Sequence, residues 1–114
     1  ELKLATAMMK HLKPVVGICH GCFLLTDLLG GIVAEVEDHM DTEHTVQYFN
    51  QEFKVNSFHS LSIVNPHKKA QVLAVDNQGS CEAWIDGNIA GVVWHPERMT
   101  MPWLPSEIQQ LLKV

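Results

Sequence analysis

The chain has 114 residues, 46% of them hydrophobic, and a formal net charge of -5, which suits one domain over residues 1–114 with a single core. The eight Lys and Arg residues form no basic stripe, and no apolar run approaches the roughly 20 residues of a membrane span. We therefore expect neither nucleic acid nor a membrane as partner. Three cysteines, of which Cys19 and Cys22 form a C-x-x-C without a second pair, indicate a reducing, cytoplasmic protein without disulfides.

Apolar spacing and glycine signals predict helix, strand, sharp turn, helix and strand in the first third of the chain. A run with apolar residues at helical spacing is ended by Lys13-Pro14. The short apolar run before Cys19 is typical of a strand buried on both faces, as in a parallel sheet. The expected elements are a helix over residues 1–12, a strand over Val15–Ile18, a helix over His20–Leu29 closed by Gly30-Gly31, and a strand over Ile32–Val36.

The remainder of the chain predicts short strands, one hairpin and a final helix. Asp86-Gly87-Asn88 lies between two apolar runs and predicts a hairpin, and Asp76–Gly79 is a turn signal. Ser106 is the expected N-cap of an amphipathic helix over about 106–113. This order predicts an α/β protein. A first strand buried on both faces needs two neighbours, so we expect further strands in an N-terminal part that this sequence lacks.

The run Gly17-Ile18-Cys19-His20-Gly21 matches the turn that holds a nucleophile between a strand and a helix. Small residues two before and two after the nucleophile permit the crowding of such a turn. The thiol would project at the carboxyl end of the sheet, where the N-terminus of the following helix favours the thiolate. The alternative is a buried cysteine that serves only packing.

A cysteine nucleophile needs a base, and the base needs an orienting group. In the run "GVVWHPERM", His95 ends an apolar strand and Glu97 follows two residues later, with Pro96 fixing the backbone between them. Functional side chains gather beyond the ends of parallel strands. We therefore interpret His95 as the base for Cys19 and Glu97 as the group that orients it.

The two motifs, "PVVGICHG" and "GVVWHPER", resemble those of class I glutamine amidotransferases and their γ-glutamyl hydrolase relatives. "LLGGIV" and "VNSFHSLSI" extend the resemblance over nearly the whole chain. It implies a flavodoxin-like fold, with a mostly parallel sheet flanked by helices, and a small-molecule γ-glutamyl substrate without a cofactor. It also implies Cys19 as nucleophile, His95 as general acid/base, Glu97 as its orienting group, the backbone N–H of His20 as an oxyanion donor, and a γ-glutamyl thioester intermediate.

The resemblance also marks substrate-binding candidates. Phe23 stands where many of these enzymes have a glutamine that helps to hold the substrate. Ser57, Phe58 and His59 lie in a segment that lines the substrate site in the family, although a partly buried edge strand is the alternative. No glycine-rich loop precedes Gly17 to supply a second oxyanion donor. This agrees with a missing N-terminal half, and we expect the fragment alone to be inactive.

A metal site is the weaker interpretation of the acidic, histidine-containing segment in the middle of the chain. His39, Asp41, Glu43 and His44 carry ligand atoms, but they lack the spacing of an open metal site. We therefore assign no metal.

The sequence leaves three functions open. The leading hypothesis is a stand-alone hydrolase of a γ-glutamyl amide, toward which "VNSFH" and "WHPER" both lean. The second is an amidotransferase subunit that passes ammonia to a synthase partner, a branch to which "FHSLSI" has some likeness. The third is a non-catalytic relative that keeps the fold, and Phe23 is the feature that favours it.

Overall fold

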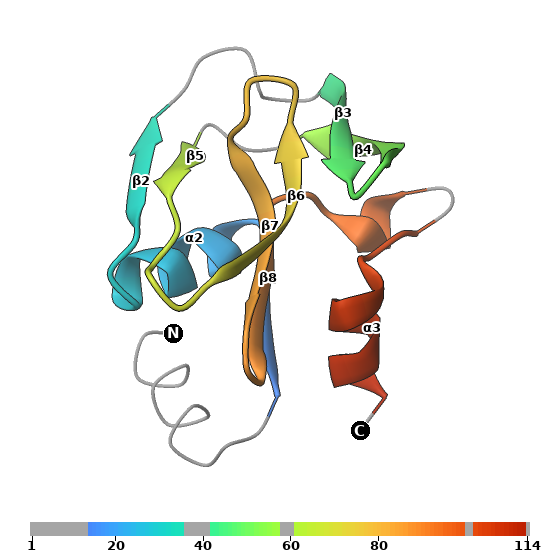
Figure 1. The fold of residues 1–114 in the computed structure, drawn as a ribbon. Helices are drawn as coiled ribbons and strands as arrows, with labels where there is room; N and C mark the ends of the chain where they lie inside the picture. The colour runs from blue at the N-terminus through green and yellow to red at the C-terminus, as the bar shows by residue number, and fades with distance from the viewer. Residues whose placement is uncertain (1–13, 36–41, 58–60, 100–101, 114) are drawn as a thin grey trace.

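The computed structural model describes residues 14–35, 42–57, 61–99 and 102–113, which form an α/β fold around one curled sheet (Figure 1). The helix expected over residues 1–12 lies outside the described residues. The described elements are β1 (Val15–Ile18), α2 (His20–Leu28), β2 (Ile32–Glu35), β3 (Thr42–Tyr48), β4 (Gln51–Ser57), β5 (Leu61–Asn65), β6 (Gln71–Asp76), β7 (Cys81–Asp86), β8 (Ile89–Val92), the 3₁₀ turn η1 (Pro96–Arg98) and α3 (Ser106–Leu112).

The sheet has eight strands in the order β1-β8-β7-β6-β3-β4, and β5 joins it by pairing with β2 and β7. Only β1 and β8 are parallel among the described pairs; the others are antiparallel. The described sheet thus differs from the mostly parallel one that the sequence predicts. The reason is that short turns connect β3 to β4, β6 to β7 and β7 to β8, and such turns pair strands only in the antiparallel sense.

Strand β1 is less buried than its apolar sequence predicts. Val15 and Val16 are half-buried, and Ile18 is 37% exposed. Within the described part of the chain β1 pairs with β8 alone, so it forms an edge of this sheet. The expectation of a strand buried on both faces is therefore wrong for the described residues, among which no second strand lies beside β1.

Helix α2 ends in the glycine cap that the sequence predicts. Gly30 adopts a φ of 101°, and its N–H donates to the carbonyl of Asp27, while the N–H of Gly31 donates to that of Thr26. These two bonds form a Schellman motif, which a residue with a side chain at position 30 would strain. Helix α2 therefore ends at Leu28, and the chain turns through the two glycines into strand β2 at Ile32.

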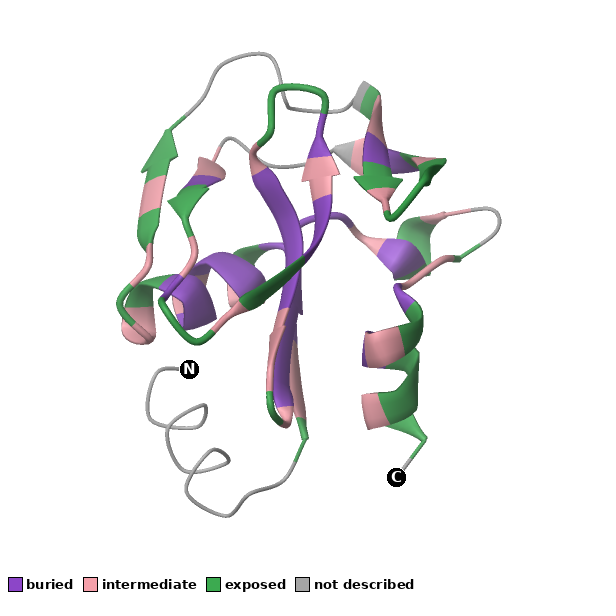
Figure 2. Cartoon of the chain, viewed as in Figure 1, coloured by how far each residue is buried: buried purple, intermediate pink, exposed green. Residues whose placement is uncertain are grey.

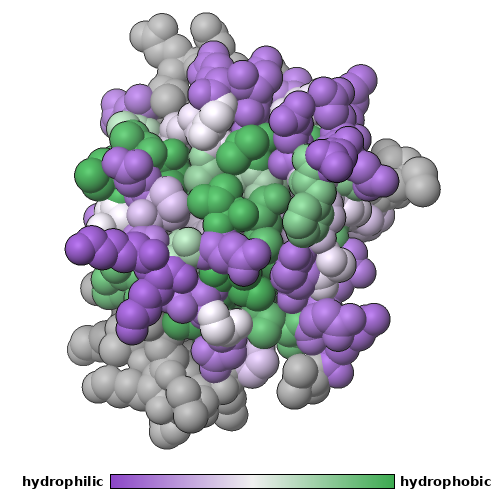
Figure 3. All heavy atoms as spheres, in the orientation of Figure 1, coloured by the Kyte–Doolittle hydropathy of each residue, from purple (hydrophilic) through white to green (hydrophobic). Residues whose placement is uncertain are grey.

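The core lies between α2 and the central strands β7 and β8, which Figure 2 shows as largely buried. Trp84 is fully buried and donates its indole N–H to the hydroxyl of Thr26 at 3.0 Å. A Cβ at Gly91 would lie 2.6 Å from the Sγ of Cys22, so α2 sits as close to β8 as a glycine allows. On the face seen in Figure 3, apolar residues gather in the middle of the view, in the region of β6, β7 and β8.

The predicted hairpin and the start of the last helix at Ser106 are confirmed, but the predicted N-cap is wrong by one residue. β7 and β8 are joined by a two-residue turn whose first residue, Gly87, has a φ of 59°. The N-cap of α3 is Pro105, not Ser106, because the carbonyl of Pro105 already accepts from the N–H groups of Ile108 and Gln109. The hydroxyl of Ser106 instead lies 2.7 Å from that of Tyr48. None of the helices in the described ranges is long and apolar enough to span a membrane.

A histidine–carboxylate pair joins β3 to β7 inside the sheet layer. The Nε2 of His44 lies 2.5 Å from a carboxylate oxygen of Glu82, whose side chain is 2% exposed. Burial by itself would lower the pKa of His44. The hydrogen bond to Glu82, with the charges of Glu82 and Asp76, outweighs it and raises that pKa above its usual value.

Replacing His44 by glutamine should remove a pH-dependent part of the stability. Because the pKa of His44 is raised in the folded state, its contribution is fully present below about pH 6.5 and is lost as the pH rises through the folded value. We expect the free energy of unfolding of the complete natural protein, measured in urea at successive pH values above 6.5, to fall more steeply in the wild type than in His44→Gln. Equal slopes would contradict the prediction.

Candidate active site

Cys19 occupies the sharp turn between β1 and α2. Its backbone has φ 52° and ψ -106°, an unusual conformation for a residue with a side chain, and it serves as the N-cap of α2. Two hydrogen bonds hold this turn: the N–H of Cys19 donates to the carbonyl of Val92 at 2.8 Å, and its carbonyl accepts from Phe23. The predicted strand, turn and helix around Cys19 are confirmed, and the side chain is 8% exposed.

The two glycines that flank Cys19 have different roles. A Cβ at Gly17 would lie 2.6 Å from the carbonyl oxygen of Gly21 and 2.8 Å from the N of Cys22, distances that no side chain tolerates against backbone. A Cβ at Gly21 would meet no atom of the described residues within 4 Å. Crowding therefore requires Gly17, whereas Gly21 contributes the backbone against which Gly17 is packed.

The thiol of Cys19 is not activated by its position at the helix N-terminus alone. Burial raises the pKa of the Cys19 thiol above its usual value, and the negative charge of Glu97 acts in the same direction. The hydrogen bond from the N–H of His20 and the positive charge of Arg98 lower the pKa but do not outweigh burial. The N-terminus of α2 thus favours the thiolate, as the sequence predicts, but burial favours the neutral thiol more strongly, because desolvation of the charged form is the larger effect.

His95 and Glu97 lie just beyond the end of β8 and contact each other. The Nδ1 of His95 is 2.7 Å from a carboxylate oxygen of Glu97. The side chain of His95 is 16% exposed, that of Glu97 56%. Partial burial by itself would raise the pKa of Glu97, but the hydrogen bond with His95, a backbone hydrogen bond and the nearby cations hold that pKa below its usual value. Glu97 is therefore ionised at neutral pH and fixes the Nδ1 side of the ring.

The parallel pairing of β1 with β8 brings the two motifs together. Ile18 pairs with Val92, so Cys19 and His95 both follow the carboxyl ends of neighbouring strands. The charges of Glu97 and Arg98 both act on the Cys19 thiol, which places the η1 turn beside it. Arg98 is a residue that sequence reasoning missed, although its place directly after Glu97 in "HPER" could have suggested it.

The structure describes only part of the predicted substrate site. Phe23 is 4% exposed and belongs to the buried core, so it offers little surface to a substrate, contrary to its assignment as a binding residue. The apolar ring packs inside because it has no polar atom to present at the site. Ser57 ends β4, and its side chain is not described. Phe58 and His59 lie outside the described residues.

A second residue that sequence reasoning missed is Asn56, which lies next to Ser57 on β4. Its amide nitrogen donates to the carbonyl of His95, and its amide oxygen accepts from the N–H of His95, both at 2.8 Å. Asn56 was within the quoted run "VNSFHSLSI", but nothing local to that run points to His95.

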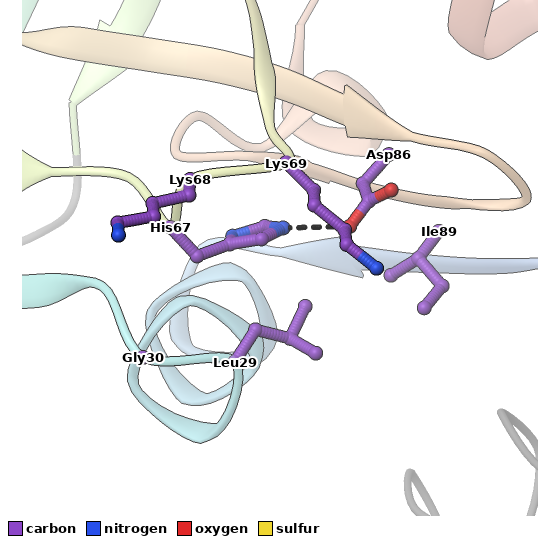
Figure 4. Close-up of a pocket in the computed structure, with 7 residues that line it drawn as sticks. All are labelled: Leu29, Gly30, His67, Lys68, Lys69, Asp86 and Ile89. Carbon is purple, nitrogen blue, oxygen red and sulfur yellow. Dashed lines mark hydrogen bonds and ion pairs between the residues drawn. The ribbon is translucent and has the colours of Figure 1, made fainter.

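The described residues show no metal cluster, and a cavity among them lies away from this site. Among the described residues, no group of three or more His, Cys, Asp or Glu side chains could hold a metal ion. Of the segment considered for metal, His39 and Asp41 lie outside the described residues. A cavity of about 640 Å³ opens at the other end of α2, where Figure 4 shows Leu29, His67 and Asp86 in its wall. The cavity lies near the start of β8, whereas Cys19 lies at its end.

The family profile "Glutamine amidotransferase class-I" matches residues 1–113. The chain belongs to the class I glutamine amidotransferase family. The resemblance inferred from the two motifs is thus confirmed.

Two curated relatives of this class I glutamine amidotransferase chain are synthase proteins. It is 37% identical over 105 residues to glutamine-hydrolyzing GMP synthase of Aeropyrum pernix, a match that covers 82% of the chain and 20% of that protein. It is 27% identical over 92 residues to anthranilate synthase component 2 of Archaeoglobus fulgidus, covering 74% of the chain and 52% of that protein. The chain thus spans about half or less of the length of these relatives.

Solved structures confirm the fold of this class I glutamine amidotransferase chain. A glutamine amidotransferase of Thermotoga maritima superposes with a TM-score of 0.74 at 17% identity, covering 97% of the chain and 50% of that structure. A glutamine amido transferase of Methylobacillus flagellatus gives a TM-score of 0.74 at 18% identity, covering 86% and 44%. The α/β class I amidotransferase fold predicted from the sequence is therefore correct.

Substituting alanine at the two elbow glycines should have opposite effects in this glutamine amidotransferase. Gly17→Ala should destabilise the complete natural protein by roughly 1–3 kcal/mol, because its Cβ clashes with backbone. Gly21→Ala, the matched control inside α2, should be neutral or stabilise by up to about 1 kcal/mol, because alanine favours helix. Urea unfolding measures both, and equal destabilisation by the two changes would contradict the different roles of these glycines.

Removing the cation of Arg98 should make the Cys19 thiol harder to ionise. The positive charge of Arg98 lowers the pKa of Cys19, so Arg98→Ala should move the pH profile of Cys19 alkylation by iodoacetamide to higher pH, and Arg98→Lys should largely restore it. Peptide mass spectrometry measures alkylation at Cys19. Burial raises the pKa of Cys81 to about 12, so that thiol stays protonated.

The matched control for this charge is Lys113→Ala, which removes an exposed cation after α3. We expect its alkylation profile to follow the wild type. A shift as large as that of Arg98→Ala would mean that only the overall charge matters, and would contradict a local role for Arg98.

Proposed function

We propose that this protein hydrolyses the γ-amide of glutamine with Cys19 as nucleophile, His95 as general acid/base and Glu97 as the group that orients His95. The observation that carries the proposal is the convergence of the strained Cys19 turn and the His95–Glu97 pair at the ends of two paired parallel strands. A nucleophile, a base and an orienting carboxylate in this order are the requirements of acyl transfer.

The chemistry follows from the protonation states of these groups. Because burial keeps the thiol of Cys19 protonated, His95 must accept its proton as sulfur attacks the γ-carbonyl carbon. Glu97 holds Nδ1, so Nε2 is the atom that takes this proton. The N–H of His20, which already donates to the sulfur, is placed to donate to the oxyanion of the tetrahedral intermediate.

The intermediate then collapses and the enzyme is regenerated. His95 gives its proton to the amide nitrogen, the carbon–nitrogen bond breaks, and ammonia leaves with a γ-glutamyl thioester on Cys19. Water then gives one proton to His95 as its oxygen adds to the thioester carbon. The carbon–sulfur bond breaks, the proton returns to sulfur, and glutamate leaves. One water is consumed for each ammonia released.

The relatives favour an amidotransferase subunit over the stand-alone hydrolase that the sequence motifs suggested first. One curated relative is named as a glutamine-hydrolysing GMP synthase, and the other as component 2 of an anthranilate synthase. We therefore propose that the ammonia serves a synthase partner, supplied by a separate chain or by a further domain. Hydrolysis of a substituted γ-glutamyl amide, without a partner, is the second candidate, supported by the lack of a polar side chain at position 23, where the buried Phe23 replaces the usual glutamine.

Ammonia release from L-glutamine by the complete natural protein tests the proposal. Cys19→Ala should lower the rate by roughly 10³-fold or more, because it removes the atom that forms the thioester. Cys81→Ala, a buried cysteine at the start of β7, is the matched control and should retain activity. Hydroxylamine should divert wild-type product to γ-glutamyl hydroxamate by capturing the thioester.

The outcomes separate the candidates. Release that persists in Cys19→Ala would overturn the assignment of the nucleophile. Release by the wild type that rises when a synthase partner is added would support the subunit. Release at full rate without any partner would instead favour the stand-alone hydrolase.

A further inference from the structure

The backbone of His95 lies beyond the last regular strand pairing of β8. The final ladder bond runs from the N–H of Val93 to the carbonyl of Glu82 at 2.9 Å. Two residues later His95 adopts φ -106° and ψ 90°, an extended conformation outside any strand. The next residue, Pro96, has no N–H with which to continue a ladder. The general base therefore stands on a segment that regular secondary structure does not hold.

The side chain of Asn56 supplies the missing pairing. Its amide donates to the carbonyl of His95 and accepts from the N–H of His95, each at 2.8 Å. These are the two bonds that a neighbouring strand makes with one residue in an antiparallel pair. The side-chain amide of Asn56 thus takes the place of the backbone of a neighbouring strand in pairing with His95.

Asparagine suits this role because of its length and its two kinds of polar atom. Aspartate has nearly the same shape but no donor, and it would set a carboxylate oxygen against the carbonyl of His95. Asn56 also stands on a firm support, because β4 pairs with β3 along its whole length and Asn56 pairs there with Glu43.

We propose that Asn56 is the positioning residue for His95, and that its amide holds the backbone of the general base so that the imidazole faces Cys19. The inference rests on the proposed function for its effect on catalysis, and on the two hydrogen bonds for its geometry. Glu97 restrains the ring of His95 and Asn56 restrains its backbone. An error of about 1 Å in such a group lowers the rate by about 10²-fold.

The test compares Asn56→Asp and Asn56→Ser with a matched control in the complete natural protein. Asn65→Asp is the control, because Asn65 is an exposed asparagine at the end of β5 and adds the same charge. We expect Asn56→Asp to lower kcat for glutamine hydrolysis by about 10²-fold with KM changed by less than about twofold. Asn56→Ser should lie between it and the wild type, and Asn65→Asp should match the wild type.

A double-variant comparison separates positioning from a merely structural role. The readout is the alkylation rate of Cys19 by iodoacetamide near neutral pH, which His95 accelerates by accepting the thiol proton. Asn56→Ser should lower this rate toward that of His95→Ala, and adding Asn56→Ser to His95→Ala should lower it no further. Circular dichroism and urea unfolding identify any variant that does not fold, in which case the other Asn56 variant decides.

Two results would overturn the inference. One is a wild-type kcat in both folded Asn56 variants; the other is an equal loss of Cys19 alkylation from Asn56→Ser with and without His95. Failure of the proposed function gives a different result. If the wild type releases no ammonia from glutamine, that function fails, while the alkylation comparison still decides whether Asn56 positions His95.

Discussion

The parallel pairing of β1 with β8 is the interaction on which the rest of the site depends. Cys19 and His95 belong to motifs far apart in the sequence, and no local contact could bring them together. The pairing of Ile18 with Val92, extended by the bond from the N–H of Cys19 to Val92, sets both motifs at one edge of the sheet. A slip of one residue in this register would turn one strand over relative to the other and separate the thiol of Cys19 from the imidazole of His95.

The start of α2, which carries Cys19, is packed closely against the same two strands. Gly17 lets the backbone of α2 come within contact distance of β1, and Gly91 lets the helix approach β8. Burial raises the pKa of the Cys19 thiol more than the hydrogen bond from the N-terminus of α2 lowers it, so the buried turn favours the neutral thiol.

Elements set by local sequence were predictable, and features set by distant contacts were not. The apolar run of β1, the glycine cap after α2 and the turn at Gly87 each depend on a few neighbouring residues. The direction of most strand pairs, the exposure of Ile18 and the burial of Phe23 depend on which segments meet in space. These features lie beyond any pattern read along the chain.

The same distinction applies to the candidate site. Cys19, His95 and Glu97 could be predicted because the family motifs place them in two short runs with fixed spacing. The role of Asn56 could not be assigned from the sequence, because its side chain contacts the backbone of His95, a residue far along the chain. Glu97 could be predicted because it lies two residues from His95, within one motif.

Three separate restraints act on His95, the proposed base, which lies on an irregular segment after β8. Pro96 excludes helical backbone at His95, Asn56 holds its N–H and carbonyl, and Glu97 holds Nδ1 of its ring. Each restraint removes a different degree of freedom of His95. If His95 is the base that we propose, its conformational entropy is lost on folding and not during the reaction, which is the physical content of a preorganised site.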